Sequence, residues 1–127
     1  MRRFGTTTVG LVALGALLGA LSTTAIGQAK GNAASGKALY TSEDCGACHG
    51  AAGKGDGAQG QKLKDKPTDW TAGDGGGMKG LTDEQLFDVI AKGGRAIGKS
   101  RGMPASKLTD QQVWDLVAYV KSLTPKK

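Results

Sequence analysis

Hydrophobic residues recur with a helical period in three stretches of the chain. The last stretch shows it best, because its large apolar residues follow the three- and four-residue steps of one helix face. These are Val113, Leu116, Val117, Val120 and Leu123. A capping box, Thr109-Asp110-Gln111-Gln112, precedes them, and Pro125 follows. The pattern predicts a C-terminal helix.

The middle stretch has the same punctuation. Thr82-Asp83-Glu84-Gln85 matches a capping box with acidic residues in the first turn. The apolar run that follows ends at Gly93-Gly94, where glycine suits the left-handed conformation of a helix C-cap. A first helix is expected from about Ala33 to Ser42, with Asn32 as its N-cap. No run alternates as a strand does, so the predicted fold class is all-α.

The N-terminus is typical of a secretory signal peptide. Arg2 and Arg3 precede an apolar run of 13 residues, Val9 to Leu21, and small residues follow it. We expect residues 1–29 to be the signal, with cleavage near 25–29, and residues 30–127 to form one domain in the periplasm. The alternative is an uncleaved segment that tethers the domain to the inner membrane, although the apolar centre is short for a span.

Cysteine and histidine occur in one place only. The two cysteines and the single histidine of the 127 residues all lie in Cys45-Gly46-Ala47-Cys48-His49. C-x-x-C-H is the attachment signature of c-type haem, in which two thiols add to the porphyrin vinyl groups and the imidazole ligates iron. The motif therefore predicts one covalently bound haem c.

Two other cysteine chemistries fit this motif less well. A structural zinc site needs four ligands, commonly in two spaced pairs, and the chain offers three in one knot. A thiol-disulfide oxidoreductase places its C-x-x-C near a βαβ unit, and no strand pattern precedes Cys45.

Glycine is concentrated after this motif. The segment Gly50 to Gly80 holds 10 of the 22 glycines of the chain. Residues 55–60 match G-x-G-x-x-G, but a dinucleotide site needs a strand before that motif. We expect backbone that wraps closely around a flat macrocycle, for which side chains must be small. A flexible linker is the alternative.

A second axial ligand of iron cannot be histidine, since His49 stands alone. The remaining candidates are Met78 and Met103. Met103 is favoured because Pro104 biases it towards extended backbone, which suits a ligand strand laid across a haem face. Met78 lies among glycines, where a methionine more often serves as filler.

Together these residues resemble the class I mono-haem cytochromes c over Asn32 to Leu123. The matching landmarks are Gly36 and Tyr40, Cys45 to Gly50, Gly102-Met103-Pro104-Ala105, and Trp114 with Leu116 to Tyr119. By the resemblance, Gly36 and Tyr40 lie where the N- and C-terminal helices cross. The resemblance implies three main helices around one haem, thioether links at Cys45 and Cys48, and axial ligation by His49 and Met103. Two positions depart from it: Ala58 stands where many relatives have a proline, and Ser106 where they often have an aromatic residue.

By the same resemblance the protein is a one-electron carrier between larger redox proteins and not an enzyme. With His49 and Met103 both on iron, no position is left for oxygen or peroxide. The alternative is a haem-based enzyme or gas sensor in which Met103 is displaced. The distal acid or base of such a site would have to be Arg95 or Arg101, because the chain has no second histidine.

Charge bears on the partners. The chain has a net charge of +6. Val89 to Thr109 contains no acidic residue and five basic ones: Lys92, Arg95, Lys99, Arg101 and Lys107. This stretch predicts docking to an acidic face on a respiratory complex, a terminal oxidase or a periplasmic dehydrogenase. Nucleic acid is not an expected partner of an exported chain with few aromatic residues.

Overall fold

The computed structural model describes residues 30–73 and 76–125, so the predicted signal segment 1–29 lies outside the described residues. The elements in chain order are α1 (Ala33–Ser42), α2 (Gly46–His49), the 3₁₀ helix η1 (Gly60–Lys62), α3 (Asp83–Lys92), the 3₁₀ helix η3 (Gly94–Ile97) and α4 (Asp110–Leu123). Within these ranges there is no strand, which confirms the all-α class. The one-turn helix α2 was not predicted. None of the described helices is long and apolar enough to cross a membrane.

The three long helices begin where their capping residues predict. The Asn32 side chain accepts a hydrogen bond from the backbone N–H of Ser35 at 2.9 Å. Thr82 and Thr109 each form both bonds of a capping box, with Gln85 and Gln112 respectively. These contacts satisfy backbone donors that an isolated helix end leaves unpaired.

Helix α3 ends differently from the expectation. Gly93 follows it with φ +86° and ψ 169°, outside the left-handed helical region that a common C-cap uses. The residue must still be glycine, because a positive φ with this ψ is strained for any L side chain. The chain turns at Gly93 directly into η3.

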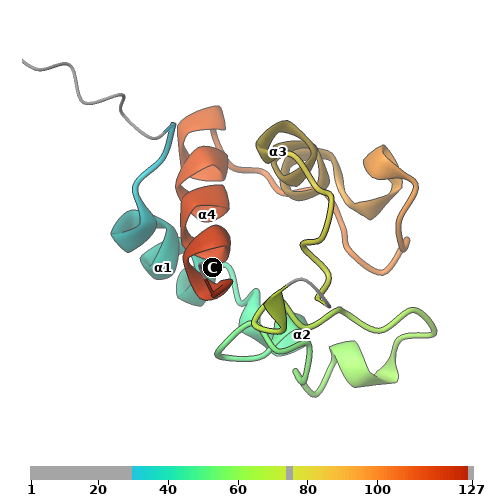
Figure 1. Ribbon diagram of the computed structural model, residues 1–127. Coiled ribbons are helices and arrows are strands. Elements are labelled where there is room, and N and C mark those ends of the chain that lie inside the picture. Colours follow the sequence, from blue (N-terminus) through green and yellow to red (C-terminus); the bar gives the residue numbers. More distant parts are fainter. Residues whose placement is uncertain (1–29, 74–75, 126–127) are drawn as a thin grey trace, which may run out of the picture.

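Helices α1 and α4 cross at Gly36. A Cβ atom at residue 36 would lie 2.0 Å from the Asp115 carbonyl oxygen and 2.8 Å from Cβ of Tyr119. The two backbones therefore touch, as the resemblance implied (Figure 1). One turn further along α1, the Tyr40 ring packs edge-on against Tyr119, with ring centroids 5.3 Å apart. The buried hydrophobic side chains of the described chain are Tyr40, Leu86, Val113, Leu116, Val117, Tyr119 and Val120.

A buried carboxylate ties the start of α1 to α4. Asp115 is only 9% exposed, and its Oδ1 accepts from the backbone N–H of Asn32 at 2.7 Å and from Gln111 Nε2 at 3.0 Å. Two donors compensate the loss of hydration that burial of a charge entails.

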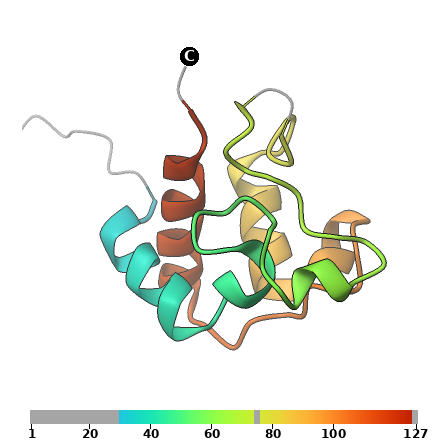
Figure 2. The ribbon, with the colours of Figure 1, turned by 90° about the horizontal axis from the view of Figure 1, so that it is seen from below.

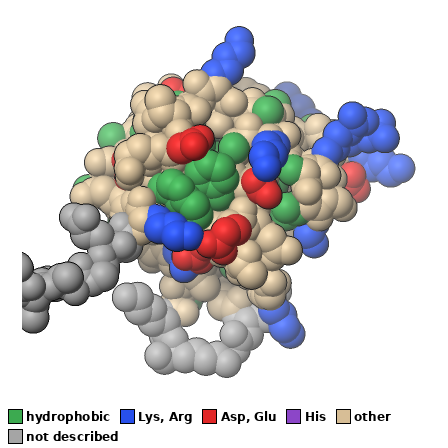
Figure 3. All heavy atoms as spheres, turned by 90° about the horizontal axis from the view of Figure 1, so that it is seen from above, with side chains coloured by type: hydrophobic (Ala, Val, Ile, Leu, Met, Phe, Trp, Pro, Cys, Tyr) green, Lys and Arg blue, Asp and Glu red, His purple; other side chains and the backbone are tan. Residues whose placement is uncertain are grey.

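Helix α3 packs on the other face of α4 through an aromatic pair. Phe87 and Trp114 lie with ring centroids 4.7 Å apart, and the Lys30 ammonium lies 4.5 Å from the centre of the Trp114 ring. Trp114 therefore faces α3, and Tyr119 is the aromatic residue of α4 that meets α1. On the face over α3 and α4, hydrophobic side chains gather between acidic and basic ones (Figure 3).

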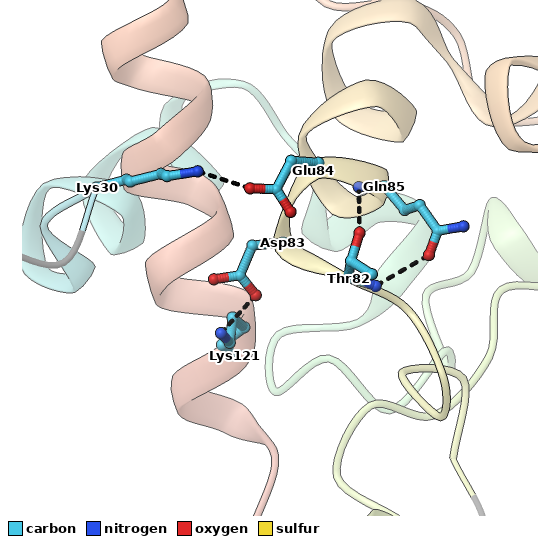
Figure 4. A network of polar contacts seen from close by, with 6 residues as sticks. All are labelled: Lys30, Thr82, Asp83, Glu84, Gln85 and Lys121. Carbon is cyan, nitrogen blue, oxygen red and sulfur yellow. Dashed lines mark hydrogen bonds and ion pairs between the residues drawn. The ribbon is translucent and has the colours of Figure 1, made fainter.

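Two ion pairs surround the start of α3 (Figure 4). Lys30 Nζ lies 2.6 Å from Glu84 Oε1, and Lys121 Nζ lies 2.5 Å from Asp83 Oδ1. Both pairs are exposed to solvent, so each contributes little to stability.

Helix α2 lies at the opposite end of the molecule from the start of α4. Figure 1 shows α1 and α4 side by side, α3 next to them and α2 below. Seen from below, the segment between α2 and α3 loops across the side that carries α2 (Figure 2).

Candidate cofactor site

The C-x-x-C-H motif forms the single turn of α2. Cys45 is its N-cap and His49 its last residue. The backbone N–H groups of Cys48 and His49 both donate to the Cys45 carbonyl, at 3.3 and 3.0 Å. Residues at positions i, i+3 and i+4 share one face of a helical turn, so the two sulfurs and the imidazole project together. Both cysteines are free thiols and are half-buried.

Two glycines of the following segment pack against the backbone of α2. A Cβ atom at Gly57 would lie 2.5 Å from the Ala47 carbonyl oxygen, and one at Gly60 would lie 2.2 Å from that of Cys48. The backbone N–H of Gln59 donates to the Ala47 carbonyl at 2.9 Å. Glycine is required here because a peptide approaches α2 more closely than any side chain permits.

Tyr40 fixes the peptide that follows the motif. Its hydroxyl is buried and donates to the Gly50 carbonyl at 2.6 Å. Burial, above all, raises the pKa of Tyr40 well above its usual range, so the hydroxyl remains a donor. Gly50 has φ +81°, and the backbone N–H of Gly55 donates to the His49 carbonyl at 2.8 Å. These bonds hold the chain on both sides of the His49 carbonyl.

The His49 imidazole lies against an aromatic ring. It stacks on Trp70, with centroids 4.4 Å apart and an interplanar angle of 27°. Its Nδ1 atom is buried, and within residues 30–73 and 76–125 no group pairs with it. Burial lowers the pKa of His49 to about 4. The imidazole is therefore neutral at pH 7, which is the protonation state a metal ligand needs.

The pKa of the Cys45 thiol is shifted in the opposite direction from that of a redox-active thiol. Burial and then the nearby Glu43 carboxylate raise the pKa of Cys45. Dithiol oxidoreductases lower this pKa to obtain a thiolate. The electrostatics of the motif thus argue against the thiol-disulfide alternative.

Met103 lies in the irregular stretch between η3 and α4. Its carbonyl accepts from the Gly94 backbone N–H at 3.0 Å, and Ser106 N–H donates to the Ile90 carbonyl at 3.1 Å. A Cβ atom at Gly93 would lie 2.9 Å from the Met103 carbonyl oxygen. The segment around Met103 is therefore bound to the end of α3 and to the start of η3.

Met78 is anchored less. Its carbonyl accepts from Leu81 N–H, three residues on, at 3.2 Å. Both methionines are half-buried, so burial does not distinguish them. The neighbouring Gly77 N–H donates to the Asp69 carbonyl at 3.0 Å, so the two methionines differ in the bond of their own carbonyl, which is tertiary for Met103 and local for Met78. On this difference we expect Met103 to be the more rigidly held thioether.

The donor set fits a covalently bound haem. Two free thiols and an imidazole that is neutral at pH 7 lie on one helical turn. The comparison with protein families agrees, because the family described as cytochrome c matches residues 33–124. The chain belongs to the cytochrome c family. Membership means a covalently bound haem c with iron and the small all-α fold of these cytochromes.

A solved structure resembles this cytochrome c domain. It is a chain of the Kuenenia stuttgartiensis reducing HAO-like protein complex Kustc0457/Kustc0458, with 28% identity and a TM-score of 0.58. The match covers 75% of this chain and 44% of the other, so the cytochrome spans less than half of that protein. A comparison with curated proteins gave no significant match.

Sequence reasoning missed Trp70 as a residue of the site. It is the sole aromatic residue between Gly50 and Gly80, and this isolation in a glycine-rich stretch was the available signal. The sequence also placed Tyr40 at the helix crossing without its bond to Gly50. In the relatives that have a proline at the position of Ala58, its carbonyl accepts from the second ring N–H of the ligating histidine; here the Ala58 carbonyl accepts no hydrogen bond from His49 Nδ1.

Proposed function

We propose that the protein is an exported mono-haem cytochrome c that carries single electrons between larger redox proteins. Cys45 and Cys48 form the thioether links, and His49 and Met103 are the axial ligands. The observation that carries the proposal is the arrangement of two free thiols and a neutral imidazole on the single turn of α2.

When bound, the haem iron supplies a one-electron couple. The chain supplies a neutral His49 imidazole and a peptide at Gly50 that Tyr40 holds by a hydrogen bond. It also supplies the Met103 thioether from a segment that is bound to the end of α3 and the start of η3. Held by the His49 imidazole and the Met103 thioether, the iron would have a higher reduction potential than with oxygen or nitrogen ligands alone. This ligand set favours electron transfer over binding of a substrate at iron.

The basic stretch around Met103 supports acidic redox partners. Lys92, Arg95, Lys99, Arg101 and Lys107 are all exposed. Lys92 pairs with Asp88 at 2.7 Å, whereas within the described ranges the other four form no ion pair. Basic side chains gather at the right edge of Figure 3, the side on which Figure 1 draws both η1 and η3 with the loops that follow them. Export agrees with the signal pattern of residues 1–29, which would act as a membrane tether if retained.

A redox subunit of a larger haem enzyme is the second candidate. The structural neighbour comes from a reducing HAO-like complex and is more than twice as long as the matched region. Such a role would use the same attachment site at Cys45, Cys48 and His49.

Ligand replacement at the two methionines tests the electron-carrier proposal. Met103→Ala is expected to abolish the long-wavelength sulfur-to-iron charge-transfer band of the oxidised protein and to lower the reduction potential, because water or lysine stabilises ferric iron better than a thioether. Carbon monoxide should then bind readily. Met78→Ala is the matched control and should leave the band in place. If the wild-type protein already binds carbon monoxide as the Met103→Ala variant does, the electron-carrier proposal is wrong, and the hypothesis of a haem-based enzyme or gas sensor takes its place.

Covalent attachment has its own test. The haem is expected to remain on the chain through acid-acetone extraction and denaturing electrophoresis. Cys45→Ala should leave at most one thioether and much less holo-protein. Complete extraction of colour from the wild-type holo-protein would show that Cys45 and Cys48 are not thioether links.

A further inference from the structure

We propose that Trp70 is a positioning residue that holds the plane of the His49 imidazole. The proposal rests on the proposed role of His49 as an iron ligand. The imidazole would be oriented by stacking on the indole of Trp70, which lies 21 residues further along the chain. It would not be oriented by the hydrogen bond that usually orients a ligating histidine.

The contacts of His49 carry this inference. A ligating histidine ordinarily donates its second ring N–H to a carbonyl, carboxylate or water, and this bond fixes the orientation of the ring. In the part of the chain that the structure describes, buried Nδ1 has no such partner. The stack on Trp70, at 4.4 Å and 27°, is the aromatic contact of this ring. Because a stacked ring cannot turn about its Cβ–Cγ bond without leaving its neighbour, Trp70 limits that rotation.

Trp70 is itself held at its backbone. Its N–H donates to the Gly53 carbonyl at 2.9 Å, and its carbonyl accepts from Thr124 Oγ1 at 3.1 Å. The first bond joins it to the loop directly after His49. The second joins it to the residue that ends α4. The stack can orient the imidazole only if the indole ring is itself held in place. These two bonds fix the backbone of Trp70, from which the indole projects.

The indole ring is confined as well. A Cβ atom at Gly53 would lie 2.8 Å from Trp70 Cε3 and 2.8 Å from Leu123 Cδ1, so glycine leaves room for the indole there. The Tyr40 ring meets the indole edge-on, with centroids 6.3 Å apart. Tyr40 also holds the Gly50 carbonyl, so one residue of α1 steadies both the peptide after His49 and the ring on which His49 stacks.

The competing explanation is that Trp70 only fills volume beside the core. A filler role needs apolar bulk and no aromatic face, so Phe and Leu should serve equally. A stacking role needs a flat ring, so Phe should substitute and Leu should not. The two substitutions therefore separate the explanations at similar cost in packing.

The wild-type holo-protein provides the first test. In the reduced, diamagnetic state, nuclear Overhauser contacts are expected between the imidazole protons of His49 and the indole protons of Trp70. Their absence would overturn the proposal without any mutation.

The variants provide the second test, read from the hyperfine-shifted haem methyl resonances of the oxidised protein. The order and spread of these resonances report the orientation of the axial ligands. Trp70→Phe should keep the wild-type order, and Trp70→Leu should lose it. The matched controls are Trp114→Phe and Trp114→Leu, because Trp114 packs against Phe87 of α3 in a tilted pair. These variants should leave the order of the resonances unchanged, whatever their effect on stability.

Equal behaviour of the Phe and Leu variants at residue 70 would overturn the proposal. If Trp70→Leu does not accumulate as holo-protein, the wild-type contacts decide. If the oxidised wild-type protein shows no hyperfine-shifted imidazole resonances from His49, the ligand assignment fails, while the stack is still tested by the contacts in the reduced protein.

Discussion

Residue 36 has room for a hydrogen atom and nothing larger. The position meets backbone atoms of Asp115, which cannot rotate away as the end of a side chain can. Gly46 offers a comparison within another helix, because a Cβ atom there would meet Cε1 of Tyr40 at 3.6 Å and the Ala51 backbone at 3.9 Å, which are ordinary contacts. Glycine is thus required at residue 36 by packing and is dispensable at residue 46.

Gly36→Ala is expected to destabilise the holo-protein by about 1–3 kcal/mol, because α1 and α4 must move apart to admit the methyl group. Gly46→Ala should leave stability unchanged or raise it by less than about 1 kcal/mol, since alanine is the better helix former. Guanidinium unfolding followed by circular dichroism measures both. Equal stability of the two variants would contradict the close crossing at Gly36.

Residues whose chemistry is local were predictable, and those whose role depends on the path of the chain were not. Asn32 and Thr109 act on backbone groups three residues away, so their identity and spacing suffice. Cys45 and His49 are likewise identified by spacing. Trp70 meets His49 across 21 positions of sequence, and nothing in the local pattern specifies that approach.

At the scale of elements, two kinds of polar contact hold α3. The capping box of Thr82 satisfies backbone donors at the helix start, whereas the Lys121–Asp83 pair joins two side chains that are 48% and 44% exposed. A cap replaces hydrogen bonds that the helix end would otherwise lack, and an exposed ion pair is screened by water and salt. The cap should therefore dominate.

Thr82→Ala is expected to cost about 1 kcal/mol of stability. Lys121→Gln should cost less than about 1 kcal/mol at low salt and almost nothing at high salt. Denaturant unfolding at two salt concentrations gives both values. A larger and salt-independent loss for Lys121→Gln would mean that the ion pair, and not the cap, secures α3 against α4.

Helix α2 shows why an element can escape prediction. Four residues carry no measurable hydrophobic period, and an isolated helix of this length is unstable in water. Its turn is stabilised from outside, by the close approach of Gly57 and Gly60 and by the bond from Gln59 to Ala47. The glycine-rich segment was expected to wrap a macrocycle, and the structure shows it packed against the attachment turn.

At the scale of the whole molecule, the distribution of charge determines how partners approach. Electron exchange with an anionic redox partner should slow as salt rises, because screening over about 10 Å at 0.1 M weakens long-range attraction. Charge reversal at Lys99 and Arg101 should flatten that dependence. Reversal at Lys37, an exposed residue of α1, is the control for reversal at Lys99 alone, and it should alter the salt dependence less. A wild-type bimolecular rate that does not change with salt would exclude docking through the basic stretch.

The buried hydrophobic core is confined to α1, α3 and α4. Within the described residues, the stretches between α2 and α3 and between η3 and α4 contribute no buried hydrophobic side chain, only half-buried ones such as Leu63 and Leu108. A domain of this size is marginal on its own core. These two stretches therefore depend on the cofactor to offset the conformational entropy of ordering them.

A haem-free Cys45→Ser/Cys48→Ser variant tests whether the two stretches need the cofactor while the helical core does not. Hydrogen exchange should lose protection first in residues 50–73 and 93–108, while α1 and α4 keep part of theirs through the Gly36 crossing and the Asp115 bonds. Circular dichroism should show reduced helix content and a broad unfolding transition. Holo wild-type protein, with both stretches protected, is the reference. If the haem-free variant unfolds cooperatively and protects residues 50–73 as the holo-protein does, the glycine-rich half is stable on the contacts of the polypeptide alone, and the cofactor serves redox chemistry without organising the fold.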